Sequence, residues 1–258
     1  MRALVTGAGK RLGREMALYL GRRGHDVAVH YSASRDEADE VVAEIRYMGR
    51  QAVAIGADLL IEAETEGLIP AAAAALGGPI SVLVNNASIF EYDTIRTGTR
   101  RSWDRAIETN LRAPFVLTQA FAGQCPPVGR DAAGEPLPSG LVVNMIDQRV
   151  NKLTPEFASY TVAKMGLWAL TRTSAQGLAP QIRVNAIGPG PTQQGLRQSA
   201  EHFARQRAAT LIGRGANAAD ITAALGFFLD SPAVTGQMIA VDGGQHLIWQ
   251  SPDVLGVE

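Results

Sequence analysis

The 258-residue sequence is poor in several features that would define other classes of protein. It has one cysteine, Cys125, which excludes an intrachain disulfide framework and suits a reducing compartment such as the cytoplasm. Its net charge is −1 with no long basic run, which argues against a general nucleic-acid binder. No window approaches the roughly 18 consecutive apolar residues of a membrane helix, and no signal-peptide pattern precedes the first strand-like segment. No metal site is expected, because ligand spacing is absent from the four histidines, His25, His30, His202 and His246.

The composition is that of a globular domain with a sizeable core, since 46% of the residues are hydrophobic and 19% are charged. Apolar runs typical of strands occupy residues 3–6, 26–30, 51–56, 81–86, 140–145, 182–187 and 237–241. Helix-like stretches lie between them, at residues 11–23, 34–49, 62–76, 100–122, 156–179 and 217–230. Most strand runs are apolar on both faces, as in a parallel sheet that helices cover on each side. The alternation predicts a single α/β domain over residues 1–258, a Rossmann fold with a doubly wound, seven-stranded parallel sheet.

Two segments interrupt this alternation. Residues 125–140 are rich in proline and glycine and are expected to form a surface loop. A domain linker is the alternative there, although the next strand continues the same pattern. Residues 188–215 are polar and partly helical and follow the end of a strand, where we expect a lid over a substrate. The chain closes with a tail, residues 245–258.

The segment TGAGKRLG, residues 6–13, follows the first predicted strand and opens the first predicted helix. Its glycines, Gly7, Gly9 and Gly13, allow a tight turn and a close approach of the backbone to a pyrophosphate. Free N–H groups and the dipole at the start of the helix favour an anion. A plain strand-to-helix turn is the alternative, but the position at the start of a βα series favours dinucleotide binding.

The second predicted strand bears on the choice between NADPH and NADH. An NAD enzyme tends to place an acidic residue near the end of this strand, to bind the ribose 2′-hydroxyl. Here no acid occurs before Asp36, whereas Ser32, Ser34 and Arg35 follow the strand and Arg11 lies in the glycine-rich turn. Cations and hydroxyls without an acid suit a 2′-phosphate, so we favour NADPH over NADH. The alternative for Arg35 is a solvated position in a first helical turn.

Tyr160 and Lys164 lie four residues apart and therefore share one face of a predicted helix. A lysine ammonium near a tyrosine stabilises the phenolate, so we expect a lowered pKa for Tyr160 and a role in proton transfer. A surface pair is the alternative for this spacing taken alone. Asp147, thirteen residues before Tyr160, adds a third ionisable group to the segment.

With these motifs the chain resembles the short-chain dehydrogenase/reductase family over essentially its whole length. The matching features keep the family's order and spacing: TGAGKRLG, Asp58, NNAS (85–88), Asn110, YTVAK (160–164), VNAIGPG (184–190) and VDGG (241–244). The resemblance implies an NAD(P)H-dependent reductase that acts on a small molecule. It also implies a homotetramer, with the helices predicted at 100–122 and 156–179 on the dimer faces.

The resemblance also assigns roles to single residues. It implies that Asp58 contacts the adenine, that Asn86 supports the cofactor site, and that Lys164 binds the nicotinamide ribose. Asn110 would hold a water for proton relay, and the carboxamide would be flanked by Pro189, Gly190 and Thr192. As alternatives, Asp58 caps the next helix and Asn110 satisfies helix backbone. To the expected cofactor site we add the neighbouring positions Leu12, His30, Tyr31, Ala87 and Ser88.

Asp147 is a departure from the wider family, which has a serine there that donates a hydrogen bond to the substrate carbonyl. A carboxylate would repel the alkoxide formed when a ketone accepts hydride. A C=N bond develops no oxyanion, and its nitrogen has to gain a proton. An aspartate beside Tyr160 can assist that proton transfer. Asp147 therefore favours reduction of a ring C=N bond.

This Asp–Tyr–Lys set resembles the pteridine reductases and the related bacterial dihydromonapterin and dihydrofolate reductases. KRLG, NNASIF and NMID resemble the corresponding pteridine reductase segments. By that resemblance Phe90 stacks on the pterin, while Ser88 and Arg11 bond the pterin edge or the cofactor phosphates. One departure is Ala33, where these enzymes often carry an arginine, so the 2′-phosphate contact falls to Ser34, Arg35 or Arg11.

We therefore expect an NADPH-dependent dihydropterin reductase in which Tyr160, assisted by Asp147, supplies the proton. A carbonyl reductase acting on a ketone or 3-oxoacyl thioester is the alternative, and a non-catalytic NAD(P)-binding sensor is a third hypothesis. The complete set of Asn110, Tyr160 and Lys164 argues against the sensor. In the tail, His246 and Trp249 are candidates for the pocket of their own or a neighbouring subunit, or Trp249 packs at an oligomer interface.

Overall fold

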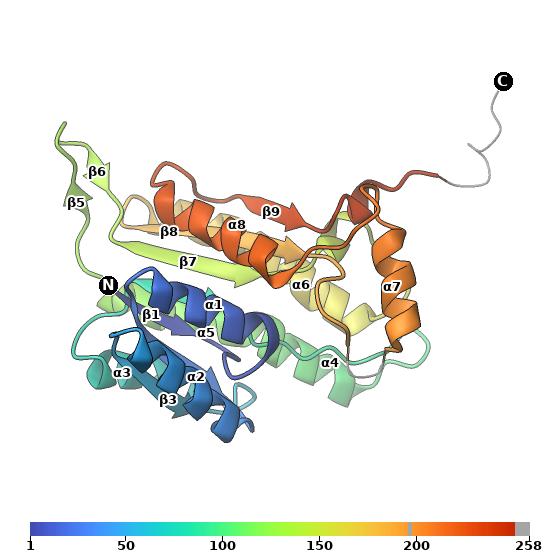
Figure 1. The fold of residues 1–258 in the computed structure, drawn as a ribbon, viewed down its shortest axis with the longest axis horizontal. Coiled ribbons are helices and arrows are strands. Elements are labelled where there is room, and N and C mark those ends of the chain that lie inside the picture. The colour runs from blue at the N-terminus through green and yellow to red at the C-terminus, as the bar shows by residue number, and fades with distance from the viewer. Residues whose placement is uncertain (196–197, 251–258) are drawn as a thin grey trace.

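The computed structural model describes residues 1–195 and 198–250 of the chain. Seven parallel strands form one sheet in the order β3-β2-β1-β4-β7-β8-β9 (Figure 1). Their bounds are β1 Arg2–Val5, β2 Asp26–Tyr31, β3 Ala52–Gly56, β4 Val82–Asn85, β7 Gly140–Met145, β8 Ile182–Pro189 and β9 Met238–Val241. The predicted single domain with a doubly wound seven-stranded sheet is thereby confirmed. The order of strands reverses between β1 and β4, and ligands of such folds bind outside the carboxyl ends of the strands at this point.

Helices cover both faces of the sheet, which explains why its strands are apolar on both sides. One face packs against α1 (Arg11–Arg22), α2 (Arg35–Tyr47) and α8 (Ala218–Asp230). The other packs against α3 (Glu62–Ala75), α5 (Ala113–Gln124) and α6 (Ala158–Leu178). Among the helices within the described residues, none is long and apolar enough to cross a membrane.

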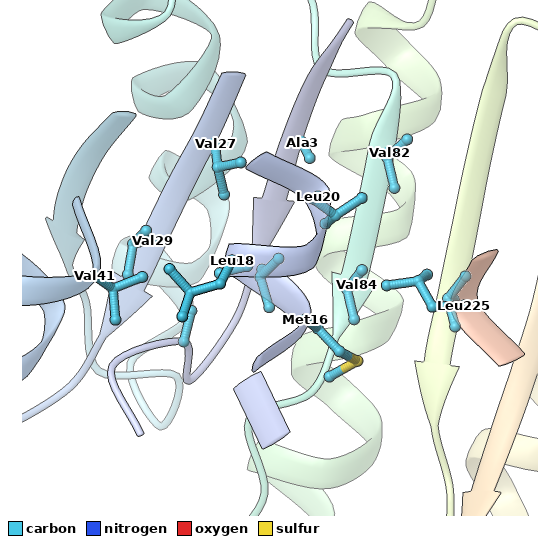
Figure 2. Packing of buried hydrophobic residues seen from close by; sticks show 14 of the residues in the cluster. Ala3, Met16, Leu18, Leu20, Val27, Val29, Val41, Val82, Val84 and Leu225 are labelled. Atoms are coloured by element: carbon cyan, nitrogen blue, oxygen red, sulfur yellow. The ribbon is translucent and has the colours of Figure 1, made fainter. Parts of the chain in front are cut away.

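The hydrophobic core between α1 and the sheet holds the ends of the strands in place. Val27 and Val29 of β2 and Val82 and Val84 of β4 point to the same side and meet Met16, Leu18 and Leu20 of α1 (Figure 2). Burying a side chain of this size contributes roughly 1.5–3 kcal/mol. The packing therefore fixes the start of α1, which follows the glycine-rich turn, relative to the carboxyl ends of these strands.

The helix expected over 100–122 is interrupted. A capping box of Thr99 and Ser102 starts α4 (Arg100–Ile107), a π-helical turn occupies Glu108–Arg112, and α5 then continues to Gln124. A π turn inserts an extra residue that the hydrophobic period of the sequence does not reveal, and such turns occur frequently at functional sites. Here the turn contains Asn110.

The two segments that break the alternation lie at opposite ends of the sheet (Figure 1). Within 125–140, β5 (Gly129–Arg130) and β6 (Pro136–Leu137) form a short exposed hairpin. Because β7 then joins the main sheet, this segment is no domain linker. Within 188–215, α7 (Ala200–Ala208) lies beyond the carboxyl ends of the strands, where a lid would be placed. Residues 196–197 of the predicted lid and 251–258 of the tail lie outside the described residues.

Candidate active site

A cleft of about 710 Å³ opens at the carboxyl ends of the strands, between the glycine-rich turn and the segment that follows β8. Eighteen of the predicted site residues line it: Gly7, Arg11, Leu12, Gly13, His30, Tyr31, Ser32, Ser34, Asp58, Asn86, Ala87, Ser88, Phe90, Asp147, Tyr160, Lys164, Pro189 and Gly190. Four others do not reach its wall: Gly9, Arg35, Asn110 and Thr192. Among the described residues, no group of three or more His, Cys, Asp or Glu side chains could hold a metal ion.

The glycine-rich turn has the geometry of an anion cradle. Gly7 has φ +62°, which favours glycine, and its N–H donates to His30 Nδ1 at 3.0 Å. A Cβ on Gly13 would lie 2.1 Å from the Gly7 oxygen, so no larger residue fits there. The N-cap of α1, Lys10, gives the helix no side-chain cap. The first-turn N–H groups therefore remain available for an anion, as a pyrophosphate requires.

His30 supports the glycine-rich turn through both nitrogens of its ring. It is buried, and its Nε2 lies 3.0 Å from the Ala57 oxygen while its Nδ1 accepts from Gly7. Burial lowers the pKa of His30, which keeps the ring neutral and leaves Nδ1 as an acceptor. Both ring nitrogens are used within the protein, so His30 orders the turn rather than offering a donor to the cleft.

The region predicted to hold a 2′-phosphate is arranged differently from expectation. The side chain of Arg35 is 74% exposed, forms an ion pair on its own helix, and does not line the cleft. Lys10 does line the cleft and pairs with Glu37 at 2.6 Å. Lys10 was not among the predicted site residues, although it follows Gly9 directly. Only the folded chain shows this proximity: a Cβ on Gly9 would lie 2.9 Å from Ser34 Oγ, so the glycine-rich turn touches the N-cap of α2.

Arg11 spans the cleft. Its guanidinium donates to the carbonyl oxygens of Gln194 at 2.7 Å and Gln193 at 3.1 Å. The side chain expected at the phosphates or the pterin edge thus joins the glycine-rich turn to the predicted lid. It has φ +54°, a left-handed conformation that is uncommon for a residue other than glycine.

Asn86 and Thr6 tie the ends of β1 and β4 together. Thr6 Oγ1 accepts hydrogen bonds from the N–H groups of Asn86 and Ala87, both at 2.9 Å, and Asn86 Nδ2 donates to the Thr6 oxygen at 2.8 Å. Thr6, which the sequence alone did not single out, thereby positions the part of the wall that packs against the glycine-rich turn. The expected supporting role of Asn86 has a concrete geometric basis.

Asp58 lies in the wall of the cleft, two residues after the end of β3. Its Oδ1 accepts from the N–H of Leu60 at 3.0 Å, and α3 begins at Glu62 with Ile61 as its N-cap. The carboxylate therefore forms a local turn and does not cap α3. This leaves Asp58 lining the cleft, where an adenine contact stays a prediction.

Three predicted catalytic side chains converge at the other end of the cleft. Tyr160 Oη donates to Asp147 Oδ2 at 2.9 Å, and the N–H of Arg149 donates to Asp147 Oδ1 at 2.8 Å. Lys164 Nζ donates to the Met145 oxygen at 2.8 Å. Asp147 leaves the end of β7 and the other two project from α6, so sheet and helix packing sets their separation.

The protonation states differ from those expected. Burial raises the pKa of Tyr160 well above its ordinary value, and the neighbouring Asp147 charge adds to the effect. Burial raises the pKa of Asp147 as well, and it lowers the pKa of Lys164 to about 8. The prediction that Lys164 lowers the Tyr160 pKa is therefore wrong for this arrangement, because burial and Asp147 dominate. Tyr160 keeps its proton at neutral pH, which suits a proton donor.

Asn110 is fully buried in the π turn, and both atoms of its amide bind one backbone segment. Its Oδ1 accepts from the Ile89 N–H at 3.0 Å and its Nδ2 donates to the Ile89 oxygen at 2.9 Å. The side chain thus fixes the loop between Ser88 and Phe90. A water bound for proton relay stays a prediction.

Phe90 belongs to an aromatic group beside Tyr160. Its ring stacks on Phe157 with 4.1 Å between centroids, and it meets Tyr160 edge-on at 4.7 Å. The side chain of Phe90 is 45% exposed and lines the cleft, so a flat ligand can contact it. Phe157, with φ +57°, was not anticipated.

Asp93 was also missed, because its partners are remote in sequence. It is buried and accepts from Ser159 N at 3.1 Å and Ser102 Oγ at 3.1 Å. These bonds hold the start of α6 against α4, one residue before Tyr160.

The segment after β8 closes the cleft on its far side. Gly190 N donates to the Val241 oxygen at 3.0 Å, and a Cβ on Gly190 would lie 2.6 Å from Asp242 Cβ. Thr192 Oγ1 turns back to the Gly190 oxygen at 3.1 Å. In the described part of the tail, His246 binds Asp242 and Trp249 is exposed, and neither lines the cleft.

The family model for short chain dehydrogenases matches residues 1–205, and the chain therefore belongs to the short-chain dehydrogenase family of oxidoreductases. The predicted membership is confirmed. A curated relative, the 3-oxoacyl-[acyl-carrier-protein] reductase FabG of Staphylococcus epidermidis, is 32% identical over 250 residues, which cover 95% of this chain and 98% of the relative.

Solved structures give a second comparison. FolM alternative dihydrofolate reductase 1 from Brucella canis, complexed with NADP, is 41% identical with a TM-score of 0.91 and covers 98% of this chain and 96% of its own. The landomycin C-6 ketoreductase LanV, with bound NADP and rabelomycin, is 27% identical with a TM-score of 0.84 over 95% of this chain and 96% of its own. The chain is thus similar both to a reductase named for dihydrofolate and to ketoreductases.

Proposed function

We propose that this protein uses NADPH to reduce a C=N bond in the ring of a dihydropterin. The cradle of Gly7, Gly13 and the uncapped start of α1 fits the pyrophosphate of a dinucleotide, and Lys10, which pairs with Glu37 and lines the cleft, is the cation we assign to a 2′-phosphate. The solved relatives with NADP support this choice of cofactor. When bound, the cofactor supplies the hydride, and the chain supplies the proton.

The observation that carries the proposal is the hydrogen bond between Tyr160 and a buried Asp147. A reduced ketone passes through an oxyanion, which a carboxylate at this position would destabilise. A C=N bond instead gains hydride at carbon and a proton at nitrogen. Tyr160 gives its proton to the substrate nitrogen, and Asp147, whose pKa is raised by burial, then takes up a proton from solvent and passes it to the Tyr160 oxygen. Proton loss from Tyr160 is then balanced by proton gain from Asp147.

Lys164 and Phe90 complete the arrangement. The Lys164 ammonium bonds the Met145 oxygen at the end of β7 and lies 5.6 Å from the centre of the Tyr160 ring, so it stabilises negative charge that develops on Tyr160. Phe90 presents an apolar surface beside Tyr160 that suits a flat heterocycle.

The test is NADPH oxidation by the purified protein with 7,8-dihydrobiopterin and 7,8-dihydrofolate, set beside a panel of ketones and a 3-oxoacyl thioester. We expect at least one dihydropterin to be the preferred substrate by kcat/KM. Brisk turnover of the oxo compounds with no turnover of dihydropterins would refute the proposal.

Carbonyl reduction is the second candidate, and the similarity to FabG and LanV favours it. Asp147 weighs against it, because a carboxylate is a poor neighbour for an oxyanion. A cofactor sensor without turnover is disfavoured by the assembled Asp147, Tyr160 and Lys164.

We also propose a homotetramer in the cytoplasm. Helices α4, α5 and α6 expose the apolar side chains Trp103, Phe115, Val162 and Met165, as expected of helices that pair with a second copy. The buried free thiol of Cys125 suits a reducing compartment. Sedimentation of the purified protein tests the assembly, and a monomer at micromolar concentration would contradict it.

A further inference from the structure

A second cavity of about 270 Å³, here named the annex, adjoins the cleft. Its wall is made by Gln148, Arg149, Lys152, Thr154, Gln206, Ala209, Gln245 and Ile248. Four of these residues also line the cleft: Gln148, Arg149, Gln206 and Gln245. The annex therefore opens from the end of the cleft that holds Asp147 and Tyr160, and not from the end formed by the glycine-rich turn.

Two residues in the wall of the annex each have a buried polar atom without a hydrogen-bond partner among the residues that the structure describes. These atoms are Oε1 of Gln148, a residue that is 8% exposed, and Nε of the half-buried Arg149. An unpaired buried polar atom costs about 1–3 kcal/mol, so native proteins rarely leave one without a purpose. An unpaired acceptor and an unpaired cationic donor on two residues of the same wall are consistent with a polar ligand that completes them.

The charge of the annex selects the kind of ligand. Arg149 and Lys152 both contribute to its wall, and no acidic side chain among the described residues does. Within the described residues, Lys152 Nζ makes one bond, to the Ile248 oxygen at 3.3 Å, and Arg149 bonds the hydroxyl of Thr154 and lies over the Phe157 ring. Asp147, two residues before Arg149, lines the cleft and already accepts from Tyr160. Two cations with spare donors favour an anion.

We infer that the annex binds an anionic substituent, a carboxylate or a phosphate, carried by the same substrate whose ring is reduced beside Tyr160. This inference rests on the proposed function and narrows its substrate class to bicyclic rings with a charged tail. The amides of Gln148, Gln206 and Gln245 line the passage from cleft to annex, where they can bond the polar atoms of a linker.

The experiment compares three dihydropterins in the intact protein: 7,8-dihydrobiopterin with an uncharged tail, 7,8-dihydrofolate with carboxylates, and 7,8-dihydroneopterin phosphate. The variant is Lys152→Gln, with Lys152→Arg to restore the charge. Arg22→Gln is the matched control, since Arg22 is an exposed cation at the end of α1 that lines neither cavity.

In Lys152→Gln we expect the ratio of kcat/KM for the favoured charged substrate over dihydrobiopterin to fall about tenfold, mainly through KM. Lys152→Arg should recover most of the ratio, and Arg22→Gln should not change it. A fall for dihydrofolate identifies a carboxylate tail, and a fall for the phosphate ester identifies a phosphate. An unchanged ratio for both overturns the inference.

Binding of the tails alone separates this inference from the proposed function. p-Aminobenzoylglutamate and glycerol phosphate are titrated calorimetrically into wild type and Lys152→Gln. If no dihydropterin is reduced, the proposed function fails, but binding of either fragment that weakens in Lys152→Gln still supports an anion site. If neither fragment binds the wild type, or both bind the two proteins equally, the annex is not such a site.

Discussion

Replacing Asp147 with serine removes a buried carboxylate and restores the hydroxyl donor found in most of the family. The two carboxylate oxygens accept from Arg149 N and Tyr160 Oη, at 2.8 and 2.9 Å. The shorter serine hydroxyl can serve only one of these groups. Leaving one buried donor unpaired costs about 1–3 kcal/mol of stability, partly offset because burial disfavours the lost charge.

The effect on activity should depend on the substrate. For a dihydropterin, Asp147→Ser removes the group that returns a proton to Tyr160, and positioned acid catalysis is worth roughly 10²–10⁴-fold. We expect kcat/KM to fall by at least about 10²-fold, equivalent to about 2.7 kcal/mol in the barrier. For a ketone the new hydroxyl stabilises the oxyanion, so kcat/KM should hold or rise.

Steady-state NADPH oxidation with dihydrobiopterin and a ketone panel measures both effects. Asp147→Asn is the matched control, because the amide keeps the shape and an acceptor for Arg149 but has no ionisable proton. It should lose dihydropterin activity without gaining ketone activity, and thermal unfolding should show that both variants fold. Unchanged dihydropterin turnover in Asp147→Ser would refute the role given to the carboxylate.

Three further predictions concern other groups. Lys10→Gln should raise KM for NADPH about tenfold and leave KM for NADH unchanged, because only NADPH carries a 2′-phosphate for the Lys10 ammonium to contact; equal changes for both cofactors would contradict this. Since the Lys164 pKa is lowered to about 8, kcat/KM for reduction should fall as pH rises through that value; a flat profile to pH 10 would count against a charged Lys164. His25 has its pKa lowered by burial to about 4, so the unfolded chain binds more protons between about pH 6.5 and 4. Urea unfolding should therefore show stability falling as pH drops through that window, with a shallower slope in His25→Gln.

The fold could be predicted because its determinants are local and periodic. Strand runs apolar on both faces require helices on both sides, and glycines at 7 and 13 require a close backbone approach at one turn. Tyr160 and Lys164 were found from their spacing together with the family motifs around them, and Asp147 from its place in that resemblance; the structure then joins Tyr160 to Asp147. The predicted order of strands and helices therefore located most of the residues that line the cleft.

What sequence could not supply depends on three-dimensional neighbours. Asp93 acts through Ser159, 66 residues away, and no periodic pattern marks such a pair. Lys10 and Arg35 are both cations near the same motif, and only the path of the chain decides which one faces the cleft. The direction of the Tyr160 pKa shift depends on burial, which outweighs the nearby lysine.

Arg11 connects two walls of the cleft. Its backbone belongs to the glycine-rich turn, and its guanidinium donates to the carbonyl oxygens of Gln193 and Gln194 in the segment after β8. Separating these two walls means breaking two guanidinium–carbonyl bonds at once, a barrier distinct from the chemical one. In such an enzyme the first product should form quickly, and the opening of the cleft that releases it should then limit the rate of later turnovers. We therefore expect a burst of product in the first turnover, and we expect Arg11→Ala to abolish this burst.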